Sequence, residues 1–412
     1  MAAFSWLVRP LEEPYRDRLD AVAARHGFPT SRQPVPLGDA VRKLSDVYNR
    51  RSAAKDALPS HEARTHLGAR LGFSFARDVP KGAAAVRELV GTGLLTLSEE
   101  TPLRVLDFGA GLGAMSHGLG RALEAHGQRG ELDVLCTDAD PNALALAREI
   151  SASTDIGLVD GPVRMRLRTE TVRVGAKVPR GPFDVILLGQ VLSELDETAD
   201  EATRVSSHLA LVDALFRELG PEGSLVVVEP ALRDRSRHLQ ALRDAFVARG
   251  GVPFAPCLHA GPCPALVREE DWCHEDLAVD LPPWLVPVAK AAGLRYQGLS
   301  FSYLVLRKDG RSLASVLPQA RLRSVSELLR TKGKTEAFLC GAFPGGPKKE
   351  RMRRLDRHAS ESNGPWERLG RGSLLDLEIP EDGVRIAEDA RVTLVAEKRL
   401  SLIHISEPTR PY

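Results

Sequence analysis

Long apolar runs and paired cysteines are scarce in this sequence of 412 residues. No run approaches the roughly 18 apolar residues that a membrane-spanning helix needs. Charged residues also interrupt the first segment, where a signal peptide would be apolar. Five cysteines are an odd number spread over a long chain, which favours buried or metal-binding thiols over a disulfide framework. We therefore expect a cytoplasmic protein without a membrane segment.

Net charge is also nearly absent, with 56 Lys and Arg against 55 Asp and Glu. The hydrophobic fraction of 43% excludes a disordered or collagen-like chain, and the length favours two or three domains. The balance hides one asymmetry, because residues 319–358 hold eleven Lys and Arg and only four Asp and Glu. Such a basic block is either a site for a polyanion or a solvated loop. Its basic residues are Arg321, Arg323, Arg330, Lys332, Lys334, Lys348, Lys349, Arg351, Arg353, Arg354 and Arg357.

The hydrophobic pattern divides the chain into a helical region at 1–100 and an alternating region at 101–311. In the first region, prolines that include Pro80 separate the predicted helices, which cover 15–26, 37–52, 60–71 and 81–95. In the second, short apolar runs alternate with helical segments, which predicts a parallel sheet with crossover helices. The predicted strands cover 104–108, 131–137, 163–170, 183–188 and 223–229, with two β-rich pieces at 295–308 that close the sheet edge.

Three further segments follow a different pattern. Residues 252–283 are rich in Pro, Cys, His and Trp and are too long for a plain connection, so we expect an insertion that is functional or held by a metal. Residues 312–399 begin with basic sequence and continue with short β-like runs, which predicts a small barrel-like appendix. Residues 400–412 resemble the translation of a sequencing adapter, and we expect them to be an artefact.

The segment from Val105 to Gly113, VLDFGAGLG, is an apolar strand followed by a glycine-rich turn that opens a helix. Its glycines let the backbone approach a ligand closely; they are Gly109, Gly111 and Gly113. The pattern alone also fits a dinucleotide site. Asp107, however, is placed to meet a cationic amino group and would repel a pyrophosphate, while Asp138 ends the next strand and can accept from ribose hydroxyls. Both carboxylates favour S-adenosylmethionine.

Three later segments are similar to motifs of Rossmann-like methyltransferases. TDADPNA at 137–143 resembles their second motif, FDVILLGQ at 183–190 their fourth strand and 223–230 their fifth. Together with the glycine-rich turn, the four motifs in this order predict an α/β Rossmann-like S-adenosylmethionine methyltransferase sheet. Gln190, at the end of the fourth strand, is expected at the cofactor.

Catalytic residues are less well defined than the cofactor site. GQVL at 189–192 stands where enzymes that methylate exocyclic amines commonly have an Asn/Asp-Pro-Pro-aromatic turn. Methylation of a pyrimidine carbon needs a nucleophilic thiol at this edge, but Cys136 lies inside a predicted strand and is expected to be buried. Because no general base can be nominated, the fold predicts cofactor binding rather than turnover.

Three cysteines, Cys257, Cys263 and Cys273, lie within 17 residues of one another. Cys340, in the appendix, is the other thiol left for a fourth ligand. Four cysteines suit zinc or an iron-sulfur cluster, whereas three cysteines with His259 or His274 suit zinc. The spacing matches neither the paired cysteines of zinc ribbons nor the compact triad of radical enzymes, so it leaves the metal open.

Taken together, these motifs resemble those of the methyltransferase-like assembly factors of the small ribosomal subunit, a family known in mitochondria and bacteria. The resemblance runs from about residue 40 to about residue 399. It is carried by LSDVYN at 44–49, the turn at 107–113, PC at 256–257, CP at 263–264, DWCH at 271–274, FSYLVL at 301–306 and LCG at 339–341. It implies a 4Fe-4S cluster on Cys257, Cys263, Cys273 and Cys340 and a role on rRNA of the small-subunit head.

We therefore predict an assembly or translation factor that binds small-subunit rRNA through the basic appendix and holds S-adenosylmethionine and the cluster. The alternative is an active rRNA methyltransferase, since methylation by the family is inferred from its fold. A small-molecule methyltransferase is a third class, which the basic block disfavours. We expect no membrane or DNA partner.

Overall fold

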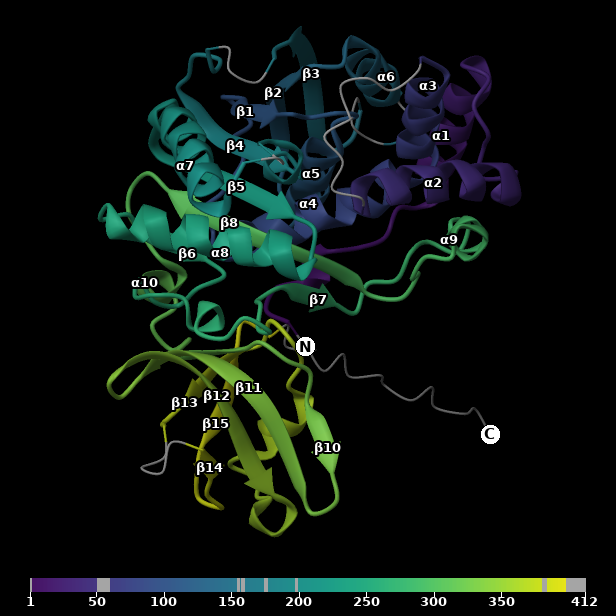
Figure 1. Ribbon diagram of the computed structural model, residues 1–412. Helices are drawn as coiled ribbons and strands as arrows, with labels where there is room; N and C mark the ends of the chain where they lie inside the picture. Colours follow the sequence, from purple (N-terminus) through teal and green to yellow (C-terminus); the bar gives the residue numbers. More distant parts are fainter. Residues whose placement is uncertain are drawn as a thin grey trace, which may run out of the picture.

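The computed structural model describes residues 2–49, 60–153, 156, 160–173, 177–196, 199–379 and 384–397. Within these residues the chain forms two sheets, a large one covered by helices and a smaller one below it (Figure 1). The tail that we expect to be an artefact, 400–412, lies outside the described residues.

The large sheet has eight strands in the order β3-β2-β1-β4-β5-β8-β6, with β7 paired to β8. Their bounds are β1 (Leu103–Phe108), β2 (Gly130–Asp138), β3 (Val163–Thr171), β4 (Phe183–Gly189), β5 (Leu219–Glu229), β6 (Pro253–Ala255), β7 (Glu275–Leu277) and β8 (Leu299–Arg307). Strands β1 to β5 are parallel, and β8 runs antiparallel to β5, β6 and β7. The five predicted parallel strands are all present, which confirms the α/β class.

The far side of the sheet differs from the prediction. One strand, β8, replaces the two expected pieces, because Gly298 turns the chain at a φ of 71° just before it begins. This strand lies inside the sheet and not at its edge, because residues 252–283 supply two short strands, β6 and β7, that pair with it. The insertion is therefore partly built into the large sheet.

Helices cover both faces of the large sheet (Figure 1). Side chains of α4 and α5 pack on one face, and those of α7 and α8 pack on the other. The helices of this region are α5 (Ala114–Ala125), α6 (Pro141–Ser151), α7 (Glu201–Arg217), α8 (Arg233–Ala248), α9 (Val286–Ala292) and α10 (Leu313–Val316). The two layers leave the carboxyl ends of β1, β2 and β4 together at one edge.

The N-terminal helices are α1 (Glu13–Arg25), α2 (Pro34–Asn49), α3 (Ser60–Ala69) and α4 (Phe75–Gly91). The expected break at Pro80 is wrong, because Pro80 lies inside α4, which follows α3 through one π-helical turn at Arg70–Ser74. An internal proline costs roughly 3 kcal/mol. Fourteen buried residues of α4 offset that cost by packing.

The small sheet has seven strands in the order β14-β12-β11-β9-β13-β15, with β10 paired to β11. Their bounds are β9 (Leu322–Ser324), β10 (Leu329–Thr331), β11 (Lys334–Phe343), β12 (Gly346–Leu355), β13 (Leu374–Leu377), β14 (Arg385–Ile386) and β15 (Val392–Val395). Its core surrounds Trp366, which is fully buried. The basic block is therefore not a solvated loop: most of it forms β9 to β12.

Candidate functional site

The glycine-rich turn lies at the carboxyl edge of the large sheet. Gly109, Gly111 and Gly113 have φ values of 69°, 52° and 82°, which residues other than glycine rarely adopt. The turn is held against the end of β2, because the Gly111 amide donates to Asp138 Oδ2 at 2.8 Å. The turn is thus fixed over the end of the sheet.

Asp107 is fully buried beneath this turn. Its Oδ2 accepts hydrogen bonds from the Ser116 amide at 3.2 Å and the Ser116 hydroxyl at 2.7 Å, so it also stabilises the start of α5. Its Oδ1 has no partner within the described residues. Burial raises the pKa of Asp107 to about 6. A buried acceptor without a partner is unfavourable, and a cationic amino group would satisfy it.

Asp138 and Gln190 lie at the ends of β2 and β4. Asp138 is half-buried and accepts from the amides of Gly111 and Asp140, both at 2.8 Å, which leaves further lone pairs on each oxygen. Gln190 has a φ of 62°, and its Nε2 donates to Asp78 Oδ2 at 2.9 Å. A non-glycine residue in this conformation is strained and marks a constrained position.

Sequence reasoning missed Asp78 and Lys81, which α4 brings to this edge. Lys81 Nζ lies 2.7 Å from Asp78 Oδ1, and both side chains are largely buried. The Asp78–Gln190 bond spans 112 residues of sequence. Sequence reasoning also missed Glu229, at the end of β5, whose carboxylate accepts from the Leu192 and Ser193 amides. Asp78 and Lys81 belong to no motif that a short window could reveal, and Glu229 lies in the fifth-strand segment 223–230 without a signal for its role.

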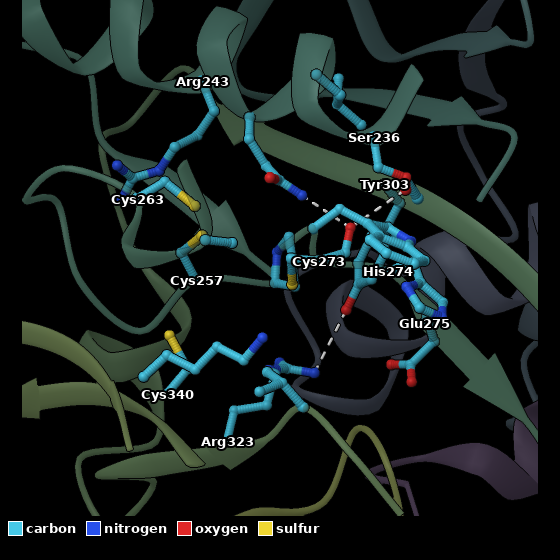
Figure 2. A pocket seen from close by; sticks show the side chains of 18 of the residues that line it. Ser236, Arg243, Cys257, Cys263, Cys273, His274, Glu275, Tyr303, Arg323 and Cys340 are labelled. Carbon is cyan, nitrogen blue, oxygen red and sulfur yellow. Dashed lines mark hydrogen bonds between the residues drawn. The ribbon is translucent and has the colours of Figure 1, made fainter. Parts of the chain in front are cut away.

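The four predicted cysteine ligands line one cavity of about 60 Å³, larger than the roughly 10–15 Å³ that one water needs. Cys257 and Cys263 lie in the loop after β6, Cys273 precedes β7, and Cys340 comes from β11 of the small sheet. Figure 2 shows Cys257 and Cys263 on the side of Arg243 and Cys340 on the side of Arg323. Burial, reinforced by the neighbouring Cys257 thiol, raises the pKa of Cys273 to about 11.

Helix α8 holds the cysteine loop. Arg243 is buried and donates to the carbonyl oxygens of His259 and Gly261, while Asp244 accepts from the Cys263 amide at 2.9 Å. One turn and a half earlier, Arg237 donates to the carbonyl oxygens of Ala265, Arg268 and Asp271. Two arginines of one helix therefore fix a loop that has little regular structure of its own.

Two histidines, His259 and His274, lie beside the cysteines of this region. Burial lowers the pKa of both His259 and His274 to about 4. His259 Nε2 lies 3.9 Å from Cys340 Sγ, and the His274 ring stacks on Trp272. In the part of the chain that the structure describes, no group of three or more His, Cys, Asp or Glu side chains is arranged to hold a metal ion. The metal-binding character of the insertion thus remains a prediction.

The basic block is divided by internal ion pairs, which sequence reasoning could not foresee. Arg323 is buried against Glu88, and Arg354 is buried against Glu367. Other members also have carboxylate partners; these are Arg321, Arg330, Lys334, Lys349 and Arg351. Among the described residues, the members without an ion pair are Lys332, Lys348, Arg353 and Arg357. The charge available to a polyanion is smaller than the sequence indicates.

The sheet order, the antiparallel strand β8 beside β5 and the glycine-rich turn at the carboxyl edge define a Rossmann-like methyltransferase fold. The chain belongs to the family described as mitochondrial small ribosomal subunit Rsm22, whose model matches residues 76–345. This match confirms the small-subunit family that the motifs predict. Among the described residues, the helices are too short or too polar to cross a membrane.

Several solved methyltransferase structures are similar to the chain at low identity. The plantazolicin methyltransferase BpumL, in complex with SAH, is 12% identical over 64% of this chain and 97% of its own, with a TM-score of 0.33. A precorrin-6y C5,15-methyltransferase from Geobacter metallireducens is 13% identical over 54% and 87%, with a TM-score of 0.30. The fold assignment follows from the strand order of the large sheet. A search of curated proteins finds no match.

Proposed function

We propose that this protein binds rRNA of the small ribosomal subunit and supports the assembly of that subunit or its use in translation. The observation that carries the proposal is the match of residues 76–345 to a small-subunit family, a range that includes both the large sheet and β9 to β11. Cations of the small sheet supply the charge, since phosphate contacts provide most of the sequence-independent affinity for a nucleic acid.

S-adenosylmethionine is the cofactor that we assign to the carboxyl edge of the large sheet. Asp107 Oδ1 would accept from its amino group, and Asp138 would accept from its ribose. Gly109, Gly111 and Gly113 would line the turn beside it. The unpartnered Oδ1 of Asp107 supports this assignment, because an ammonium group supplies both the hydrogen bond and the charge that the buried carboxylate lacks.

A 4Fe-4S cluster is the group that we assign to the cysteine cavity. Its ligands would be Cys257, Cys263, Cys273 and Cys340, and the support is that these four thiols, three from the loop between β6 and β7 and one from β11, line one space. Thiolates suit iron-sulfur clusters and zinc. A Cys₃His zinc site that uses His259 or His274 is the alternative. When bound, the cluster would link β11 to the loop that α8 holds.

An active S-adenosylmethionine-dependent rRNA methyltransferase is the second candidate. The observation that favours it is the Asp78 carboxylate, which reaches the end of β4 and contacts Gln190, where a methyl acceptor would approach. The GQVL turn at 189–192 disfavours it, because it lacks the proline-rich turn used in amine methylation. We rank it below the binding function for that reason.

The test is cosedimentation of the full chain with small-subunit precursor particles, with and without S-adenosylmethionine, followed by mapping of methylated nucleotides. We expect sedimentation with the particles and no new methylated nucleotide. Asp138→Ala should lower the affinity for S-adenosylmethionine, measured by calorimetry, about 5- to 150-fold, because the lost hydrogen bonds are worth about 1 to 3 kcal/mol. A protein that never sediments with the particles would contradict the proposal, and a newly methylated nucleotide would favour the second candidate.

A further inference from the structure

Phe338, on β11, is an aromatic residue left outside the core of the small sheet. Its neighbours along the strand, Ala337 and Leu339, are fully buried in that core, whereas Phe338 points to the opposite face and is half-buried. Among the described residues it belongs to no buried cluster and has no aromatic partner. Part of the ring therefore stays accessible on the outer face of the small sheet.

Two cations from the neighbouring strand lie against this ring. Arg351 of β12 lies directly opposite Phe338 in the antiparallel register, with its Cζ 5.9 Å from the ring centroid. Lys349, two residues earlier on the same face, places its Nζ 5.4 Å from the centroid. Arg353 follows two residues later, opposite Glu336. Three cations therefore lie in a row on β12 with the ring beside them.

Two carboxylates lie among these cations, and each of them is already paired. Glu336, on β11, is nearly buried between Lys334 and Arg351, at 3.0 and 2.7 Å. Lys349 pairs with Asp271 of the cysteine loop. Arg353 forms no ion pair among the described residues, so it can accept a phosphate as a new partner.

A row of cations beside a partly exposed ring is an arrangement that proteins use for single-stranded nucleic acid. The cations follow the phosphates, while the ring stacks on a base, and stacking tolerates any base because each has a π-face. A double helix would offer phosphates but no free base face for Phe338. Charge complementarity and the ring together thus favour an unpaired strand.

We propose that the outer face of β11 and β12 is a stacking platform for one unpaired base of RNA, with Phe338 under the base and Arg353 on a flanking phosphate. This inference rests on the proposed rRNA-binding function and narrows it to single-stranded RNA at a named site. The platform begins two residues from Cys340 on the same face of β11, so it lies next to the cysteine cavity.

The test measures binding of the full chain to a short single-stranded RNA that carries one 2-aminopurine base, whose fluorescence falls on stacking. Phe338→Leu keeps an apolar side chain but removes the ring, and it should weaken binding at least about fivefold. It should also abolish the fluorescence change and leave the slope of log affinity against log salt unaltered. Phe338→Trp should restore both signals. Arg353→Gln should instead lower the slope by about 0.7, the value for one phosphate contact on a single strand.

The matched control is Phe216→Leu, which removes a ring that also lies under a cation, Lys308 Nζ at 4.9 Å, but in the large-sheet region. This variant should bind RNA like the parent, and equal melting temperatures would show that each variant is folded. Wild-type affinity and fluorescence in Phe338→Leu would overturn the platform while leaving rRNA binding intact. A parent protein that binds neither the RNA nor precursor particles would overturn the proposed function as well.

Discussion

Asp107 places a carboxyl group in the core of the large sheet, and its burial makes the stability of the protein depend on pH. An unfolded aspartate has a pKa near 3.9, whereas burial raises the pKa in the folded protein to about 6. Between these values the folded state binds more protons than the unfolded state, so stability falls as the pH rises. Above about pH 6 the full free-energy cost of ionising the buried carboxyl group is present, unless a cationic ligand pairs with the carboxylate.

Asp107→Asn should remove that pH-dependent cost. In the protein without ligand, the loss of unfolding free energy between pH 4 and pH 7 should shrink by about 2 kcal/mol, since one pKa unit corresponds to about 1.4 kcal/mol. Urea unfolding of both proteins at the two pH values measures it. The same variant should bind S-adenosylmethionine more weakly, because it loses the charge opposite the amino group. An equal change in unfolding free energy between the two pH values for both proteins would contradict this prediction.

At the scale of elements, a buried charge network joins helix α4 to both sheets. Arg87 Nη2 of α4 lies 2.5 Å from Glu275 Oε2 of β7, and Arg323 Nη2 of β9 lies 2.5 Å from Glu88 Oε1 of α4. The Tyr303 hydroxyl of β8 donates to Glu88 at 2.9 Å. Two guanidinium groups and two carboxylates balance, which is the condition under which charges can be buried.

Breaking this network on one side should be costly. Arg323→Met leaves Glu88 buried without its partner, and we expect a loss of about 3 to 5 kcal/mol of unfolding free energy. The double variant Arg323→Met with Glu88→Met replaces both charges by apolar side chains and should recover much of that loss. Urea unfolding of the single and double variants measures the coupling. Strictly additive losses would show that the two residues do not depend on each other.

At the scale of the whole molecule, the small sheet lies below the large one (Figure 1), and side chains from both sheets line the cysteine cavity. The N-terminal segment also lies at this junction, where the Ala3 amide donates to the Gly372 carbonyl oxygen at 3.1 Å. If the cavity holds a cluster, its binding free energy is partly folding free energy. The metal would then fix the orientation of the small sheet and of its RNA-binding face.

Cys340→Ser should therefore lose the metal and loosen the small sheet. Anaerobically purified parent protein should contain about four irons per chain, and the variant should contain far less. Hydrogen exchange should quicken in β9 to β15 more than in β1 to β5. Cys136→Ser, which changes a fully buried thiol of β2 outside the cavity, should keep its iron. Stoichiometric zinc retained by Cys340→Ser would contradict both the cluster and the link, and would favour a Cys₃His site.

The sequence by itself determined the parts of this protein that depend on short-range signals. The apolar runs of β1 to β5 and the glycines at 109, 111 and 113 reveal themselves within a few residues, because strand burial and a positive φ are local requirements. Cys257, Cys263 and Cys273 could be nominated as metal ligands because they lie close together in the sequence. The order of the motifs along the chain was sufficient to predict the α/β class and the family.

Only the tertiary structure decided which distant residues meet. It placed Asp78 on Gln190, Arg323 on Glu88 and Cys340 beside the loop after β6, although these partners are far apart in sequence. It also kept Pro80 inside a helix and divided the basic block into buried and available cations. The physical reason is that long-range contacts and buried charges are selected by the packing of the whole chain, and that packing outweighs local propensity.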